Sequence, residues 1–188
     1  MFNIRQIPLA ALIGLLLTGL AVIGALFAQW IAPHGNGEIV GDVWVPMSSA
    51  HWLGTDNLGR DLLSRMIYGA RITIFIAGMA TALSFSLGAI LGFTAAVVGG
   101  LVDTLMSGVV DLLMAIPTLI FGLVILAVLP ANNVTLILVM GILSSTRVYR
   151  LSRAVAADIN AMDFVEAAKL RGEGLGWIIF REILPNAM

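Results

Sequence analysis

Uncharged apolar segments alternate with charged segments along the chain, and they are long enough to determine the fold class. Residues 9–32 carry no charged side chain and exceed the roughly 20 apolar residues that a helix needs to cross a bilayer. Further apolar segments cover residues 72–102, 112–130 and 133–149. The pattern predicts an all-α, polytopic membrane protein with about four transmembrane helices. A cleaved signal peptide is the alternative for the first segment, but this segment is too long and lacks a clean cleavage site.

The composition agrees with a membrane protein. Of the 188 residues, 60% are hydrophobic and 11% are charged, compared with about 25% charged residues in soluble domains. The mean hydropathy is +1.02, and the net charge of −1 does not indicate nucleic-acid binding. Because the chain has no cysteine, disulfides, thiolate metal sites and cysteine nucleophiles are excluded.

The second predicted span has a face almost without side-chain bulk. Small residues recur on it every four positions: Ser84, Gly88, Gly92, Ala96 and Gly100. In lipid, such a stripe lets another helix approach closely. We therefore expect a helix-packing surface here rather than a ligand site.

The third span contains Pro117, which lacks a backbone donor and is expected to bend the helix. Asp111 lies directly before this span. If the helix began at Thr104 instead, Asp111 would lie about 10 Å deep at 1.5 Å per residue, and it would be a candidate pathway or interface residue. Because 112–130 is already long enough to cross, the sequence favours Asp111 at the membrane interface.

The positions of arginine and lysine predict the orientation of the chain. With a cytoplasmic N-terminus, three basic residues fall outside, namely Arg60, Arg65 and Arg71. The others fall inside: Arg5, Arg147, Arg150, Arg153, Lys169, Arg171 and Arg181. This distribution follows the positive-inside rule, so we expect the N-terminus in the cytoplasm and residues 33–71 outside.

The second half of the outside loop, residues 51–71, predicts a short amphipathic helix that lies on the membrane surface or on neighbouring spans. Thr55 or Asp56 is a candidate N-cap, and the apolar residues that follow have helical spacing. Asp56 with Arg60, and Asp61 with Arg65, form acid-before-base pairs four residues apart.

The same loop holds both histidines of the chain, His34 and His51, among several carboxylates. Two histidines this far apart in an irregular segment do not have the spacing of a metal-binding motif. We therefore expect no metal site.

Residues 154–188 are polar but retain the pattern of helices. Alanine, leucine and charged residues dominate up to Leu170, and three glycines, Gly172, Gly174 and Gly176, then interrupt the helix. A second helix is expected to follow and to end at Pro185. Since the segment is too charged to enter the bilayer, we expect a helix-turn-helix unit on the cytoplasmic face.

Three interpretations of this unit remain open and differ in what covers its apolar side. An amphipathic pair lying on the inner leaflet is the first. DNA or phosphate binding is disfavoured, because acidic residues nearly balance the basic ones and no P-loop lysine follows the glycines. Docking to a soluble cytoplasmic protein is the favoured interpretation.

Two motifs resemble those of a known family. EAAKLRG at residues 166–172, followed by ILP at 183–185, resembles the cytoplasmic coupling loop of bacterial ABC importer permeases, although Glu182 stands where the general pattern has isoleucine. LGTDNLGRDLLSRMIYGAR at 53–71 is similar to the segment before the second span of dipeptide, oligopeptide and nickel permeases. The resemblance covers nearly the whole chain.

The resemblance implies a type I ABC importer-like permease subunit in a bacterial inner membrane, for peptides or a similar small solute. A separate ATPase subunit would bind the ATP, so this chain would need no cofactor. A second permease subunit and an extracytoplasmic solute-binding protein are further implied partners, besides the lipid bilayer. The implied ATPase-docking residues are Glu166, Ala167, Ala168, Gly172, Leu184 and Pro185.

Permeases of this family have two further spans, six in all, whereas this chain stops at Met188. The resemblance thus implies a partial transmembrane domain at residues 72–188, preceded by residues 1–71 with the first span and the outside loop. We expect an amino-terminal fragment of a permease, with an inactive or scaffold-like fragment as the alternative. An intramembrane enzyme is disfavoured, because the spans hold no nucleophile and base pair, HExxH motif or paired aspartates.

Overall fold

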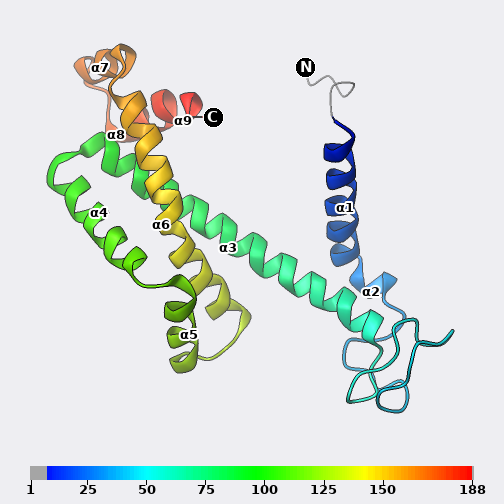
Figure 1. The fold of residues 1–188 in the computed structure, drawn as a ribbon. Coiled ribbons are helices and arrows are strands. Elements are labelled where there is room, and N and C mark those ends of the chain that lie inside the picture. The colour runs from blue at the N-terminus through cyan, green and yellow to red at the C-terminus, as the bar shows by residue number, and fades with distance from the viewer. Residues whose placement is uncertain (1–7, 188) are drawn as a thin grey trace. The chain divides into compact units, whose positions relative to one another are not determined.

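The computed structural model describes residues 8–187 and is helical (Figure 1). Arg5 and Met188 lie outside the described residues. The helices are α1 (Leu9–Leu26), α2 (Ala28–Ile31), α3 (Leu62–Val98), α4 (Gly100–Ala115), α5 (Thr118–Val128), α6 (Asn133–Asn160), α7 (Asp163–Leu170), α8 (Leu175–Trp177) and α9 (Leu184–Asn186), with a π-helical segment, Ile178–Ile183, before α9. The predicted all-α fold is confirmed.

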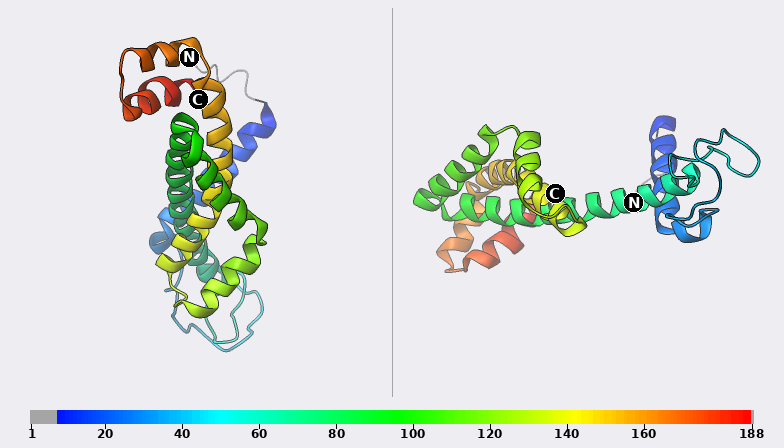
Figure 2. Two further views of the ribbon diagram at one scale, coloured as in Figure 1. Left: turned by 90° about the vertical axis from the view of Figure 1, so that its left-hand side faces the viewer. Right: turned by 90° about the horizontal axis from the view of Figure 1, so that it is seen from below.

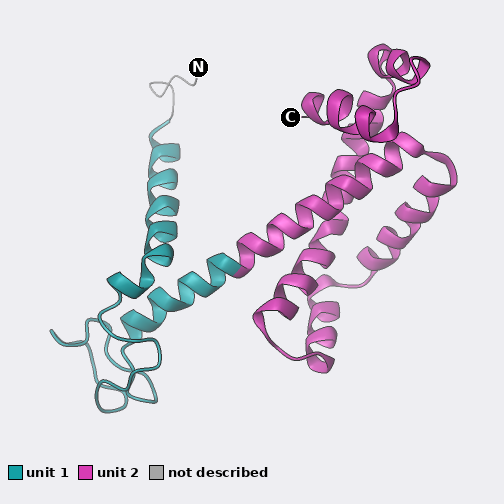
Figure 3. Ribbon diagram, turned by 180° about the vertical axis from the view of Figure 1, so that it is seen from behind, with its two compact units in different colours: residues 1–75 teal, residues 76–188 magenta. Residues whose placement is uncertain are grey.

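The chain divides into two units, Met1–Phe75 and Ile76–Met188 (Figure 3). Among residues 8–187, three helices are long and apolar enough to cross a membrane, namely α1, α3 and α6. The helices α4 and α5 pass the same test only as a pair bent by 85°, which makes a fourth, broken span or a re-entrant loop. These helices agree with a polytopic protein of about four spans.

The third predicted span, residues 112–130, is wrong as a single helix. The chain breaks between Ala115 and Thr118, because Pro117 provides no N–H to continue the helical hydrogen bonds. With 11 residues, α5 is about 16 Å long, which is roughly half the thickness of the hydrocarbon core. Pro117 therefore does more than bend a spanning helix, as it separates two short ones.

The second predicted span ends earlier than residue 102. Gly99 and Gly100 have φ values of 65° and 56°, a left-handed conformation that favours glycine. The chain therefore turns after Val98, and α4 begins directly at Gly100. As a result Gly100 belongs to the next helix, and no atom lies near the position that its Cβ would take.

Within the second unit, α3 and α6 pack against each other at the small-residue stripe. A Cβ on Gly88 would lie 2.5 Å from Cβ of Val148, and one on Gly92 would lie 2.7 Å from the carbonyl oxygen of Tyr149. These distances leave no room for a side chain, so the helices meet almost backbone to backbone. Ser84 is buried on the same face. The predicted packing surface is confirmed at these three positions.

In the first unit, residues 55–61 form irregular structure and not the first turns of an amphipathic helix. The helix begins at Leu62, where Asp61 acts as N-cap: its Oδ2 accepts the backbone N–H of Ser64 at 2.8 Å. The predicted short helix that begins at Thr55 or Asp56 is therefore wrong, since helical structure starts only at Leu62, in the first turn of the long helix α3. The pair of Asp61 with Arg65 is also wrong, because Arg65 pairs with Asp56.

Asp56 organises the turn before α3. Its Oδ1 accepts the backbone N–H groups of Leu58 and Arg60 at 2.8 and 3.0 Å. Its Oδ2 accepts from the side chains of Arg60, at 2.9 Å, and Arg65. The predicted pair of Asp56 with Arg60 is thus confirmed as one part of a larger network.

Two glycines of the same segment are required by close approaches of the backbone. Gly54 and Gly59 have φ values of 79° and 72°. A Cβ on Gly54 would lie 2.3 Å from the carbonyl oxygen of Val45, and one on Gly59 would lie 2.2 Å from that of Gly41. Any other residue would clash and would also strain the backbone.

We predict that Gly88→Val destabilises the second unit by about 1–3 kcal/mol, because the added side chain must push α6 away. Gly78→Val is the matched control on α3, since the position of its Cβ is open. Chemical unfolding of the purified chain in detergent measures both variants. Equal stability of the two variants would refute the close contact between α3 and α6.

We predict that the turn before α3 loosens in acid. Burial raises the pKa of Asp56, but the hydrogen bonds from Arg60, Leu58 and Arg65 outweigh this effect and hold the pKa well below its ordinary value of 3.8. The resulting stabilisation is complete above about pH 4 and is lost as the pH falls through the lower folded-state pKa.

Hydrogen exchange of the Leu58 and Arg60 amides, corrected for intrinsic rates, should show this loss of protection. Asp56→Asn removes the titrating group, so these two amides should be less protected at neutral pH and should not respond further to acid. An unchanged acid response in Asp56→Asn would show that another group controls the turn.

Candidate functional site

The site that the sequence indicates is the helix α7 and the chain that follows it, and its two faces differ. Val165 and Ala168 are fully buried, each with 0% exposure, whereas Glu166 and Ala167 are exposed. Residues three apart lie on one side of a helix. The helix α7 therefore attaches through Val165 and Ala168 and presents Glu166 and Ala167 outward.

The buried side of α7 belongs to a core that joins four helical segments. Val165 packs with three isoleucines of the π-helical segment: Ile178, Ile179 and Ile183. Phe93 of α3 and Ile159 of α6 belong to the same cluster. The helix α7 and the π-helical segment lie side by side near the end of α6 (Figure 2). Movement of α7 is thus resisted by a core that includes residues of both long helices of the unit.

The glycine after α7 ends the helix in a Schellman motif. The N–H of Gly172 donates to the carbonyl of Lys169 at 2.9 Å, and the N–H of Glu173 donates to the carbonyl of Ala168 at 3.2 Å. Gly172 has a φ of 81°, which is the left-handed position that this motif assigns to glycine. The predicted turn at Gly172 is confirmed.

Polar contacts link α7 to the neighbouring helices. Nζ of Lys169 donates to Oδ1 of Asn160 at 2.8 Å, and Nδ2 of Asn160 donates to the carbonyl of Ala96, at the end of α3, at 3.2 Å. The break between α6 and α7 follows directly after Asn160. The expectation of one helix over residues 154–170 is therefore wrong: α6 supplies its first part and α7 its second.

Arg171 connects the turn to the segment that follows. Its guanidinium lies 3.8 Å from a carboxylate oxygen of Glu173 and 3.7 Å from one of Glu182. It also lies over the ring of Trp177, 5.7 Å from the centroid. Glu182, which departs from the family pattern, thus has a local structural role, because it pairs with Arg171.

The helix after the turn ends at Asn186, one residue beyond the expected end at Pro185. Residues 175–186 are helical throughout, with the π-helical segment directly before α9. Proline lacks an N–H and its ring displaces the carbonyl four residues earlier, and a π turn is one way to accommodate such a defect. The side chain of Asn186 donates to the carbonyl of Glu182 at 2.6 Å.

The six predicted docking residues are not equivalent in the structure. Glu166, Ala167, Gly172 and Pro185 are exposed, and Leu184 is partly buried against the core. Ala168 is fully buried within the chain. Its small size serves the contact of α7 with its own core, and the surface open to a partner consists of the exposed residues. The pairing of Lys169 with Asn160 was not predicted.

Asp111 lies inside α4, which begins eleven residues before it at Gly100, so the expectation that it precedes a helix is wrong. Its carboxylate, 59% exposed, pairs with Arg150 of α6 at 2.6 Å. A second pair, Asp103 with Arg153, joins the same two helices. The acidic residues of α4 and the arginines of α6 were the sequence signal from which these two ion pairs between the helices could have been predicted.

The structure also brings together side chains that the sequence does not link. The rings of His34 and His51 lie 5.8 Å apart, measured between centroids, and Asp61 lies beside them. Separation along the sequence is thus a poor guide to distance in this loop.

Residues 84–188 match the model of a protein family described as binding-protein-dependent transport system inner membrane component. The chain belongs to this family. The match includes the α3–α6 contact, the broken helix pair and the whole of α7–α9. It confirms the family resemblance that the coupling-loop motif indicates.

Curated relatives extend the similarity to the first unit. The chain is 35% identical over 185 residues to the di/tripeptide transport system permease protein DppC of Pseudomonas aeruginosa, covering 95% of this chain and 61% of the relative. It is 32% identical over 179 residues to the oligopeptide transport system permease protein OppC of Bacillus subtilis, covering 95% and 59%. The chain thus spans about three fifths of the length of these relatives.

Proposed function

We propose that this chain acts as a transmembrane permease subunit of an ATP-driven importer and couples a separate ATPase to solute movement through α7. One observation carries this proposal: α7 exposes Glu166 and Ala167 on its outer side, while its inner side is fixed to both α3 and α6 through a common core. A partner that pushes on the outer side would therefore move both long helices.

The geometry of α7 suits a docking element better than a membrane-surface helix. The apolar side that a membrane-surface helix would turn toward lipid is buried within the chain at Val165 and Ala168. The exposed side of α7 carries charged residues, among them Asp163, Glu166 and Lys169. The alanine between them allows close approach, and Glu166 offers a charge that a basic group of the partner would pair with. The Schellman turn at Gly172 fixes where the docking helix ends.

The names of the relatives support a proposal for the class of solute. The printed names of the relatives refer to di/tripeptide, dipeptide and oligopeptide transport. We propose peptides, or a similar small solute, for this chain. Asp111 and Arg150 lie on exposed parts of the unit, which makes Asp111 a candidate residue of the pathway or of an interface with a second permease subunit.

We further propose the orientation with the N-terminus in the cytoplasm of a bacterial cell. Residues 1–71 would then contain the first span and an outside loop facing the solute-binding protein, and residues 72–188 a part of the transmembrane domain. In this orientation α7 faces the cytoplasm, where the ATPase subunits bind ATP.

We predict that Glu166→Lys and Gly172→Val reduce both solute uptake and co-purification of the ATPase by about 10-fold or more. The first variant reverses the docking charge, and the second forces a β-branched residue into a left-handed position. Both are measured in the assembled transporter that contains this chain, by uptake of labelled peptide and by quantifying the ATPase that remains bound.

Two control variants change similar residues that are not among the six predicted docking residues. Asp158→Lys reverses an exposed charge on α6, and Gly174→Ala alters a glycine with negative φ and open space around it. Both should retain uptake. Normal uptake in Glu166→Lys and Gly172→Val would refute the coupling role, whereas retained ATPase binding without uptake in the unmodified chain would favour a scaffold.

A further inference from the structure

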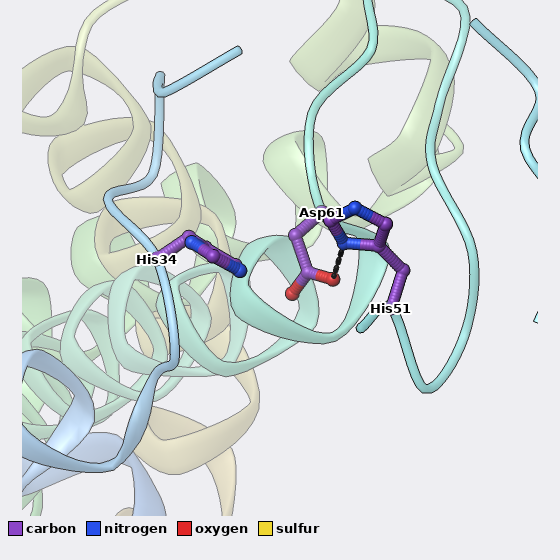
Figure 4. A group of neighbouring side chains, drawn as sticks. All are labelled: His34, His51 and Asp61. Atoms are coloured by element: carbon purple, nitrogen blue, oxygen red, sulfur yellow. Dashed lines mark ion pairs between the residues drawn. The ribbon is translucent and has the colours of Figure 1, made fainter. Parts of the chain in front are cut away.

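Three potential metal ligands meet in the loop before α3. One ligand atom each from His34, His51 and Asp61 lies within 4.8 Å of the other two. The two imidazole rings approach the Asp61 carboxylate from different sides (Figure 4). The three residues come from separate parts of the first unit: the segment after α2, the middle of the loop and the residue before α3.

The closest pair has the separation of two ligands of one ion rather than that of a hydrogen bond. Nδ1 of His51 lies 3.5 Å from Oδ1 of Asp61, which is longer than the usual 2.7–3.2 Å of an N–H···O hydrogen bond. Two ligand atoms, each about 2.0–2.1 Å from a tetrahedral zinc ion, lie about 3.4 Å apart. The observed distance therefore fits an ion held between the two atoms.

The same nitrogen has no other hydrogen-bond partner. Nδ1 of His51 is buried and finds no acceptor or donor among residues 8–187. A buried polar atom without a partner is costly. A cation beside it, also bound by the neighbouring carboxylate, would satisfy it directly.

Hydrogen bonds from Ser64 position Asp61 and the backbone of His34. Its N–H and Oγ both donate to Oδ2 of Asp61, at 2.8 and 2.7 Å, while its Oγ accepts the backbone N–H of His34 at 3.0 Å. These bonds occupy one carboxylate oxygen and leave Oδ1 facing His51. Ser64 is fully buried. Such supporting hydrogen bonds are typical of the residues that orient metal ligands.

We propose that His34, His51 and Asp61 bind a divalent transition-metal ion of the zinc type. Two imidazoles and one carboxylate form a ligand set that suits zinc and related d-block ions and does not suit calcium or magnesium, which prefer oxygen ligands alone. A fourth position remains for water. The ion would join the three segments of the loop at the start of α3, a role independent of the proposed transport function.

The full chain is purified with a tag that contains no histidine and is washed with a chelator. It is then titrated with Zn²⁺, and binding is measured by calorimetry. The chain has only these two histidines and no cysteine, so the background is low. We expect one Zn²⁺ per chain. Co²⁺ should bind at the same place and give the intense visible absorption of a tetrahedral complex, whereas Ca²⁺ and Mg²⁺ should not compete.

Variants distinguish Zn²⁺ binding at the proposed site from weak Zn²⁺ binding at surface carboxylates. His34→Ala and His51→Ala should each weaken Zn²⁺ binding by about 100-fold, and Ser64→Ala by about 10-fold, within the range of losses known for residues around metal sites. Asp61→Asn tests the carboxylate while keeping an oxygen that can cap α3. Asp42→Asn, an exposed residue of the same loop, is the matched control and should bind as the unmodified chain does.

The proposal is overturned if the unmodified chain binds no Zn²⁺, or if it binds no more tightly than His51→Ala. In either case His51 and Asp61 form an ion pair only. Circular dichroism of each variant confirms that its helices remain. If Asp61→Asn loses its helical signal, the two histidine variants still decide the outcome, because neither side chain caps a helix.

Discussion

The close crossing of α3 and α6 is the contact on which the second unit depends. At Gly88 and Gly92 the two backbones approach so closely that no Cβ fits. This approach brings Phe93 of α3 and Ile159 of α6 into one cluster, and the same cluster receives Val165 of α7. The surface that we propose for docking is thus built on the helix crossing. Without the two glycines, the helices would separate and the core beneath α7 would open.

Much of this unit could be predicted because it depends on local rules. The stripe of small residues predicts the packing face of α3, and the order of helix, glycine and helix predicts the turn at Gly172. Helix boundaries were harder, because apolar residues continue through breaks that depend on backbone conformation. The left-handed pair Gly99 and Gly100 ends α3 within an unbroken apolar segment, and Pro117 divides the next segment completely. Hydrophobicity alone does not report such breaks.

The loop of the first unit could be predicted less well, since its structure depends on contacts between residues that are distant in the sequence. Asp56 and Asp61 looked equivalent as members of acid-base pairs. In the structure Asp56 accepts from two arginines, whereas Asp61 caps α3 and faces His51. Spacing along the chain does not distinguish these roles, because the loop folds back through the close approaches at Gly54 and Gly59. The same folding brings His34 and His51 close together despite their separation in the sequence.

The sequence motif of α7 combines two constraints that the structure separates. Glu166 and Ala167 face outward, where a partner would select them, whereas Ala168 faces the chain's own core, where any larger side chain would displace α7 from the cluster below. Loss of transport on changing Ala168 would therefore report on the attachment of α7 and not on docking. Glu166 is exposed and does not belong to that attachment, so only the outward residues test the proposed recognition by an ATPase. A motif of adjacent residues on a helix is thus read correctly only when the face of each residue is known.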